Sequence, residues 1–147
     1  MDAIDREILA VLQRDGRITA TELAKRIQLG LSATSERLRQ LRRSGVILGY
    51  TVVVDPAATG RPIEALVDVR LAPGTRQTIL DETLQGFPAI VDATHLTGRF
   101  DTQLRVACAD VAELDRLLIA LKEDLGAEET NTRLVLRTIE GFPRSAL

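Results

Sequence analysis

The sequence has few of the residues on which most enzyme chemistry depends. Its 147 residues include one cysteine, one histidine, one tyrosine and no tryptophan. A single cysteine excludes an internal disulfide. We find no Cys–His or Ser–His–Asp set, no metal-ligand cluster and no glycine-rich phosphate loop in the chain. We therefore predict that the protein is not an enzyme and binds no cofactor.

Long apolar runs are also absent. No stretch of about 18 apolar residues occurs, so a membrane span is not expected, and residues 1–5 do not resemble a secretory signal. Cys108 lies among small apolar residues and is predicted to be buried rather than reactive. The sole histidine, His95, is predicted to be structural rather than a pH switch. These features favour a cytoplasmic globular protein.

The charge of the chain is unevenly distributed. Residues 1–54 carry nine Lys or Arg and six Asp or Glu, a net charge of +3, whereas residues 55–147 carry ten and fifteen, a net charge of −5. The overall charge of −2 hides this difference. Charge asymmetry of this kind points to a basic nucleic-acid face on one half of the chain.

Apolar residues at three- and four-residue spacing predict three helices in the first 45 residues. The first spans residues 3–15 with Asp2 as its N-cap, and the second spans residues 20–27 behind a capping box formed by Thr19 and Glu22. Gly30 permits a tight turn before the third helix, Leu31–Arg43. Three short helices with such a turn form a helix-turn-helix. The β-branched residues 46–54 predict a strand or bent hairpin that suits a wing.

The outer face of the third helix carries the two kinds of group that DNA binding needs. Arginine neutralises phosphates, and small polar groups near the helix start reach base edges. Ser32, Ser35, Glu36 and Arg39 are predicted to lie closest to the bases, with Arg39 as the main guanine reader. Arg37, Arg42 and Arg43 are predicted to be phosphate contacts or charges that cap the helix. The whole predicted set is Ser32, Thr34, Ser35, Glu36, Arg37, Arg39, Gln40, Arg42 and Arg43.

A solvated basic helix is the alternative interpretation, because arginines near a helix C-terminus also suit its dipole. The capped helix before the turn and the strand after Gly45 favour DNA binding over this alternative.

The second half of the chain follows a different pattern. Residues 55–62 contain two prolines and a glycine and are predicted to be a linker between residues 1–54 and residues 63–140, with residues 141–147 as a tail. Strands are predicted at residues 63–71, 89–97, 100–108 and 130–139, with a two-residue turn at residues 98–99. Helices are predicted at residues 75–85 and from the Asp110 cap to about residue 125. This order is a ferredoxin-like βαββαβ, a four-stranded antiparallel sheet with both helices on one face, so the chain is of the α+β class.

The residues of both halves resemble the Lrp/AsnC, or feast/famine, family of bacterial and archaeal transcriptional regulators. The resemblance covers nearly the whole chain and is carried by residues 4–9, 15–18, 22–26, 37–41 and 45–50, together with TGRFD at residues 97–101, which resembles the family's Gly-x-x-Asp loop. Two departures stand out. Gly30 stands where the family usually has a capping serine, so Ser32 is an alternative cap and the helix start is open. Arg99 and Phe100 stand where the family often has an acidic or small polar residue and then Tyr.

The resemblance implies that residues 63–140 sense an amino acid and form a homodimer that assembles into a tetramer or octamer. It implies an effector site near the Gly-x-x-Asp loop, with Asp101 on the α-amino group and Arg99 on the α-carboxylate, and with Gly98 and Thr132 nearby. A plain hairpin with a solvated Asp101 is the alternative. The strands also carry apolar residues on what we predict to be both faces of the sheet, which favours a dimer interface: Ile90, Val91, Leu96, Leu104, Val106, Leu134, Val135 and Leu136.

The sequence thus predicts a sequence-specific regulator of double-stranded DNA, with a palindromic operator to match a two-fold dimer. Two alternatives remain: a regulator that needs no ligand, and a small-molecule-binding or interaction module whose helix-turn-helix docks protein.

Overall fold

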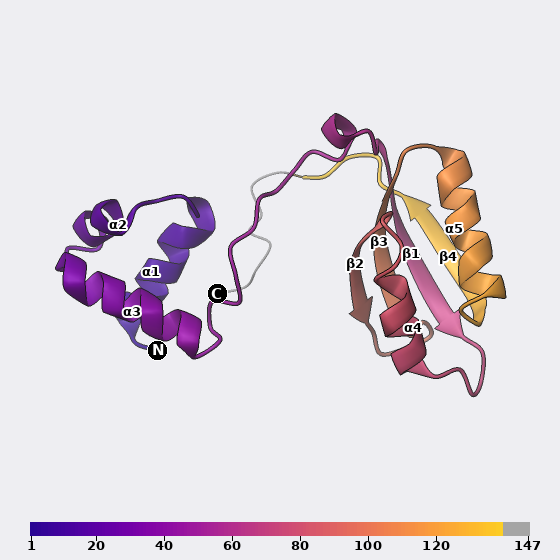
Figure 1. Cartoon of the computed structure of the whole chain (residues 1–147), viewed down its shortest axis with the longest axis horizontal. Coiled ribbons are helices and arrows are strands. Elements are labelled where there is room, and N and C mark those ends of the chain that lie inside the picture. Colours follow the sequence, from indigo (N-terminus) through magenta and orange to yellow (C-terminus); the bar gives the residue numbers. More distant parts are fainter. Residues whose placement is uncertain (140–147) are drawn as a thin grey trace. The chain divides into compact units, whose positions relative to one another are not determined.

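The computed structural model describes residues 1–139, apart from the side chains of residues 77 and 79 (Figure 1). Contacts divide the chain into two compact units, one built from Met1–Val53 and the other from Val54–Thr138. The predicted tail, residues 141–147, lies outside the described residues. Among the helices of residues 1–139, none combines the length and the apolar character that a membrane span requires.

The N-terminal unit contains the three predicted helices, α1 (Ala3–Arg14), α2 (Ala20–Arg26) and α3 (Leu31–Arg43). Asp2 caps α1 by accepting a hydrogen bond from the Asp5 backbone N–H. At α2, the predicted capping box is present: the Glu22 N–H donates to the Thr19 hydroxyl oxygen at 3.2 Å, and the Glu22 carboxylate accepts from the Thr19 N–H. The core of this unit is small and consists of Ile8, Val11, Leu23, Ile27 and Leu41.

The turn between α2 and α3 differs from the prediction in its backbone. Gly30 has a φ of −65°, which any residue can adopt, and the left-handed conformation falls instead on Gln28, with a φ of +54°. Gln28 allows the Leu29 N–H to donate back to the Ala24 carbonyl at 2.9 Å. The short connection therefore depends on a non-glycine residue in a conformation that is uncommon for side chains of its kind.

Residues 46–54 do not form the predicted strand or wing. The β-branched residues of this segment favoured a strand, but a strand needs a hydrogen-bonded neighbour, and this segment has none assigned in the described chain. Ile47 packs against the core of the N-terminal unit. The other apolar side chains of the segment are exposed: Val46, Leu48, Tyr50, Val52, Val53 and Val54.

The second unit is a four-stranded antiparallel sheet in the order β2-β3-β1-β4, as expected for a ferredoxin-like fold (Figure 1). The strands are β1 (Ile63–Leu71), β2 (Ile90–His95), β3 (Thr102–Cys108) and β4 (Ala127–Leu134). The helices are α4 (Gln77–Leu84) and α5 (Val111–Glu123), and the latter is capped by Asp110 as predicted. The predicted linker is part of this unit, because Arg61 donates to the Ala107 carbonyl and pairs with Glu113.

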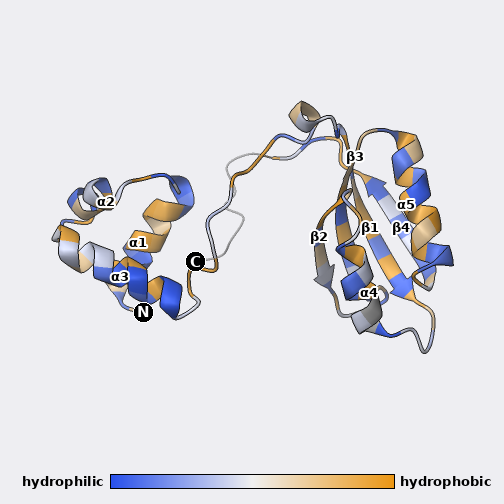
Figure 2. Cartoon of the chain, viewed as in Figure 1, coloured by the Kyte–Doolittle hydropathy of each residue, from blue (hydrophilic) through white to orange (hydrophobic). Residues whose placement is uncertain are grey.

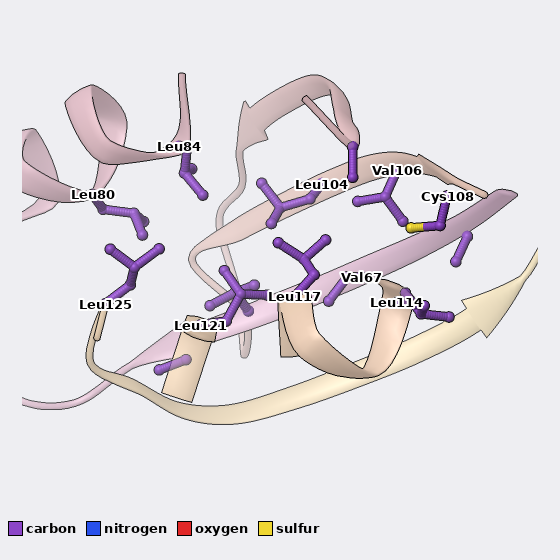
Figure 3. Packing of buried hydrophobic residues seen from close by; sticks show 14 residues of the cluster. Val67, Leu80, Leu84, Leu104, Val106, Cys108, Leu114, Leu117, Leu121 and Leu125 are labelled. Carbon is purple, nitrogen blue, oxygen red and sulfur yellow. The ribbon is translucent and has the colours of Figure 1, made fainter. Parts of the chain in front are cut away.

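The core of this unit lies between one face of the sheet and the two helices (Figure 3). Leu80 and Leu84 of α4 and Leu114, Leu117 and Leu121 of α5 pack against alternate residues of the strands: Ala65, Val67, Val69, Leu104, Val106 and Cys108. Cys108 is completely buried, as predicted, and burial raises the pKa of its thiol.

Two strand boundaries were predicted wrongly. β2 and β3 are joined by residues 96–101, a six-residue loop rather than the two-residue turn, in which the Leu96 N–H donates to the Asp101 carbonyl. β4 begins directly after Gly126, several residues earlier than predicted, because pairing with β1 recruits Ala127 and the polar residues 128–131. The apolar residues that suggested a later strand, Leu136 and Ile139, lie beyond the sheet and are exposed.

The face of the sheet that lacks helices is polar, not apolar. Leu104 and Val106, which we expected to extend an apolar surface to both faces, belong to the buried core, and Ile90 packs against it. The other face places Asp68 at its centre, only 7% exposed, where it accepts hydrogen bonds from Gln103, Asn131 and Arg133. Alternating hydrophilic and hydrophobic residues along the strands mark the two faces (Figure 2). An uncovered apolar sheet face is therefore no argument for a dimer.

Leu121 is completely buried, whereas Ile119 on the same helix is 45% exposed. Leu121→Ala should lower the free energy of unfolding by about 2–5 kcal/mol, since it leaves a cavity in the core. Ile119→Ala, as a matched control, should lower it far less. Urea unfolding of the full chain followed by circular dichroism measures both. Equal losses would contradict the assignment of Leu121 to the core.

Candidate DNA-binding helix and effector site

α3 exposes most of the residues predicted to bind DNA. Leu38 and Leu41 turn toward the core of the N-terminal unit, while Ser35 is half-buried. The other side of the helix is open to solvent and carries Ser32, Glu36, Arg39, Gln40, Arg42 and Arg43. A helix held by its apolar side with arginines and small polar groups on the free side matches the requirements of a recognition helix.

The helix begins at Leu31, so the structure does not support a start moved to Ser32. Gly30 is the N-cap, with extended backbone angles and no side-chain cap, and its carbonyl accepts the Thr34 N–H at 2.9 Å. A glycine can occupy this position because the N-cap requires only an extended backbone and a free carbonyl.

Thr34 does not belong to the exposed face. Its side chain is completely buried, and its hydroxyl donates to the Gly30 carbonyl at 3.1 Å. Such a bond to the carbonyl four residues earlier satisfies a buried hydroxyl within the helix. The prediction that Thr34 contacts DNA is therefore wrong.

Arg37 connects helices rather than reaching outward. Its Nη1 atom lies 2.7 Å from Asp2 Oδ2 and 2.7 Å from Asp5 Oδ1, at the N-terminus of α1. The Asp5 and Asp2 carboxylates raise the pKa of Arg37. The Asp5 backbone N–H, followed by Arg37, lowers the pKa of Asp2. Instead of the predicted phosphate contact, Arg37 forms ion pairs that tie α3 to α1. Spacing along the helix could not reveal these pairs, because Asp2 and Asp5 lie more than 30 residues away in the sequence.

The candidate effector residues are bound to the sheet rather than free. Asp101 Oδ2 accepts the Leu71 N–H at 2.7 Å, and the Asp101 N–H donates to the Val69 carbonyl at 2.9 Å. Asp101 therefore holds the loop of residues 96–101 against the end of β1, with its side chain half-buried and hydrogen-bonded through one oxygen. Gly98 takes a φ of +113° within this loop, a conformation that favours glycine.

Arg99 is exposed and pairs with Glu129 of β4 at 2.5 Å, while its guanidinium lies 5.4 Å from the ring centre of Phe100. Glu129 also binds Arg70 at 3.0 Å. Thr132 is placed farther along β4, opposite Val67 of β1. The structure thus brings Arg99 and Asp101 onto one loop, and sets Thr132 in the interior of the neighbouring strand pair.

A hollow of about 400 Å³ lies beside the edge strand β2, next to α4. Its lining includes the apolar Leu84 and Ile90 and the polar His95. His95 Nε2 lies 3.1 Å from Asp81, and Nδ1 lies 3.1 Å from the hydroxyl of the buried Thr102. Sequence reasoning did not find this hollow, because α4 and β2 are brought together only by folding. Within residues 1–139, no cluster of three His, Cys, Asp or Glu side chains could hold a metal ion.

Comparisons with known proteins also divide the chain into two parts, with the boundary between residues 47 and 64. A family model described as winged helix-turn-helix DNA-binding matches residues 1–47, and one described as the Lrp/AsnC ligand binding domain matches residues 64–143. The HTH-type transcriptional regulator FL11 of Pyrococcus horikoshii is 33% identical over 94% of this chain and 91% of its own length. The leucine-responsive regulatory protein of Haemophilus influenzae is 31% identical over 95% and 86%.

Solved structures share the complete fold. A transcriptional regulator from Neisseria meningitidis, crystallised in complex with L-Met, superimposes with a TM-score of 0.85 at 26% identity and covers 96% of this chain and 93% of its own. The LrpC protein of Bacillus subtilis superimposes with the same score at 25% identity, over 95% of this chain and 97% of its own.

The lowered pKa values of Asp2 and Glu22 predict acid sensitivity. A carboxyl whose pKa is lower in the folded chain stabilises the fold above its unfolded pKa, about 4. This contribution disappears as the pH falls through the lower, folded value. The melting temperature should therefore fall between pH 5 and pH 3, and the fall should be smaller for Asp2→Asn.

Scanning calorimetry of the full chain across this range measures the effect. Asp115→Asn, an exposed change on α5 in the other unit, is the control and should follow the wild type. If Asp2→Asn were as acid-sensitive as the wild type, the ionised Asp2 carboxylate, held by the Asp5 N–H and Arg37, would not stabilise the N-terminal unit.

Proposed function

We propose that this chain, which belongs to the Lrp/AsnC family of transcriptional regulators, reads its operator with the exposed face of α3 and responds to an amino acid bound by its second unit. Family membership makes the chain an effector-modulated, DNA-binding regulator rather than an enzyme. At residue level, the proposal rests on the two sides of α3. One side is held by the core and by Arg37, and the other is exposed and carries three arginines. As a regulator bound to chromosomal DNA, the protein would act in the cytoplasm.

On the free side of α3 we assign two roles. Arg39, 64% exposed, is the guanine reader, since an arginine fork fits the two acceptors of guanine in the major groove. Ser32, Ser35 and Gln40 lie beside it as further base-edge contacts, while Glu36 is paired with Arg39 and Arg43. Arg42 and Arg43, in the last turn, bind phosphates and supply sequence-independent affinity.

For the effector we propose the loop of residues 96–101, within the part of the chain that matches the Lrp/AsnC ligand binding domain. The α-carboxylate of an amino acid would take the place of Glu129 at Arg99, because both present the same group to the guanidinium. One oxygen of Asp101 holds Leu71, and the other can accept a hydrogen bond from the α-amino group. Gly98 and Thr132 complete the proposed site. The relative crystallised with L-Met supports an amino acid as the ligand class.

We further propose a homodimer that assembles into a tetramer or octamer on palindromic DNA. The apolar residues of the segment 46–54 and of residues 134–139 support this assembly. Val52 is 81% exposed, Leu48 is 94% exposed and Leu136 is 95% exposed. Contiguous exposed apolar side chains in a soluble protein usually mark an interface. A two-fold dimer presents two copies of α3 to two half-sites.

Arg39→Ala tests the assignment of α3. Fragments selected from genomic DNA supply an operator, and fluorescence anisotropy measures the affinity. The variant should lose about 1–3 kcal/mol of operator binding and discriminate less at one base pair. Arg14→Ala, an exposed arginine at the end of α1, is the control and should bind as the wild type does. Equal binding by Arg39→Ala and the wild type would remove Arg39 from the site.

Arg99→Gln tests the effector site. Thermal-shift measurements with single amino acids should identify one that raises the melting temperature of the wild type, since a ligand of the folded state stabilises it. The variant should need a higher concentration of that amino acid, whereas Arg116→Gln on α5 should not. Sedimentation in the presence of the same amino acid reports assembly. A ligand that stabilises the wild type and Arg99→Gln equally would place the effector elsewhere.

A further inference from the structure

The exposed face of α3 carries one carboxylate among its arginines. Glu36 is the sole acidic residue of α3 and is 54% exposed. Its Oε2 lies 3.0 Å from Arg39 Nη1, and its Oε1 lies 3.0 Å from Arg43 Nη2. One side chain thus binds two of the three exposed arginines, one by each oxygen, across two turns of the helix.

These ion pairs lie where DNA would have to bind. Arg39 and Arg43 are 64% and 68% exposed, so water screens both pairs and each is weak. Arg37, in contrast, is 30% exposed and already satisfied by two carboxylates of α1. The arginines paired with Glu36 can therefore exchange partners, while Arg37 stays in place.

A DNA phosphate would compete directly with Glu36. To bind Arg39 or Arg43, a phosphate must either displace the carboxylate or share the guanidinium with it, and in both cases it stays close to the negative charge of Glu36. A guanine edge carries no net charge, and an arginine has five N–H donors, so Arg39 can contact guanine without losing Glu36. The carboxylate thus opposes phosphate contacts more than base contacts.

We propose that Glu36 is a specificity-determining residue, which lowers the affinity for DNA of any sequence more than it lowers the affinity for the operator. The inference rests on the proposed function of α3 and concerns the discrimination between sites rather than DNA binding itself. Non-specific binding depends almost entirely on phosphate contacts. A residue that weakens those contacts alone raises the ratio of specific to non-specific affinity.

Glu36→Gln tests the proposal, because it removes the charge and keeps the length and helix propensity of the side chain. Glu7→Gln is the matched control: it makes the same charge change in the same unit, at an exposed position of α1. Each variant of the full chain is titrated with a random-sequence duplex and with the selected operator, at several salt concentrations. Circular dichroism verifies that both variants fold, and Glu36→Ala serves as a second variant at the site.

Glu36→Gln should bind the random duplex several-fold more tightly than the wild type, with a smaller gain at the operator. The plot of log affinity against log salt should steepen by about 0.9 for each added phosphate contact. Glu7→Gln should stay close to the wild type on both duplexes. Glu36→Ala should change in the same direction as Glu36→Gln.

Two results would overturn the proposal. Equal gains by Glu36→Gln and Glu7→Gln would mean that only the net charge matters. A loss of operator affinity with unchanged binding to the random duplex would make Glu36 a direct base contact instead. Absence of DNA binding by the wild-type chain would refute the proposed function of α3, a result separate from both.

Discussion

The N-terminal unit must bury one side of three short helices with a core cluster of only five residues, and it must still leave one side of α3 bare. A core of this size supplies little stability by itself. The structure adds polar interactions at the helix ends, namely the capping boxes at Asp2 and Thr19 and the ion pairs of Arg37. These interactions lie at the periphery of the core and use no residue of the free side of α3. Core packing and the ion pairs of Arg37 both attach the other side of α3 to the unit, and this leaves the free side available for DNA.

In the second unit, β1 has two different environments on its two faces. Ala65, Val67 and Val69 pack under α4 and α5. Asp68, between two of them, accepts hydrogen bonds from three side chains on the opposite face. A buried carboxylate is tolerated only when its hydrogen bonds are satisfied. The Asp68 network therefore fixes the register of β1 with both of its neighbours, since Gln103 comes from β3 and Asn131 and Arg133 come from β4. A partner molecule on this face would meet charges in defined positions rather than an apolar sheet.

The sequence predicted best those elements whose pattern is local. α3 and β1 were predicted with their observed bounds, because periodic apolar residues and turn residues mark both ends. β4 was misplaced because its first half is polar and is a strand only through pairing with β1. The segment 46–54 has the composition of a strand but no neighbouring strand within the described chain. In α3, the candidate DNA-binding helix, helical spacing could not show that Thr34 is buried or that Arg37 contacts Asp2, a residue 35 positions away.

The two units also constrain how an effector could act. An effector changes DNA affinity only if it binds two states of the protein with different affinity. The ion pair between Arg99 and Glu129 and the bond from Leu71 to Asp101 tie the loop of residues 96–101 to the strands of its own unit, whereas α3 is held by contacts inside the other unit. If the proposed assembly forms, the effector-dependent step of such a regulator lies in the arrangement of its copies rather than in the shape of α3. Linkage then requires that an operator which favours one arrangement also raises the affinity for the effector by the same factor.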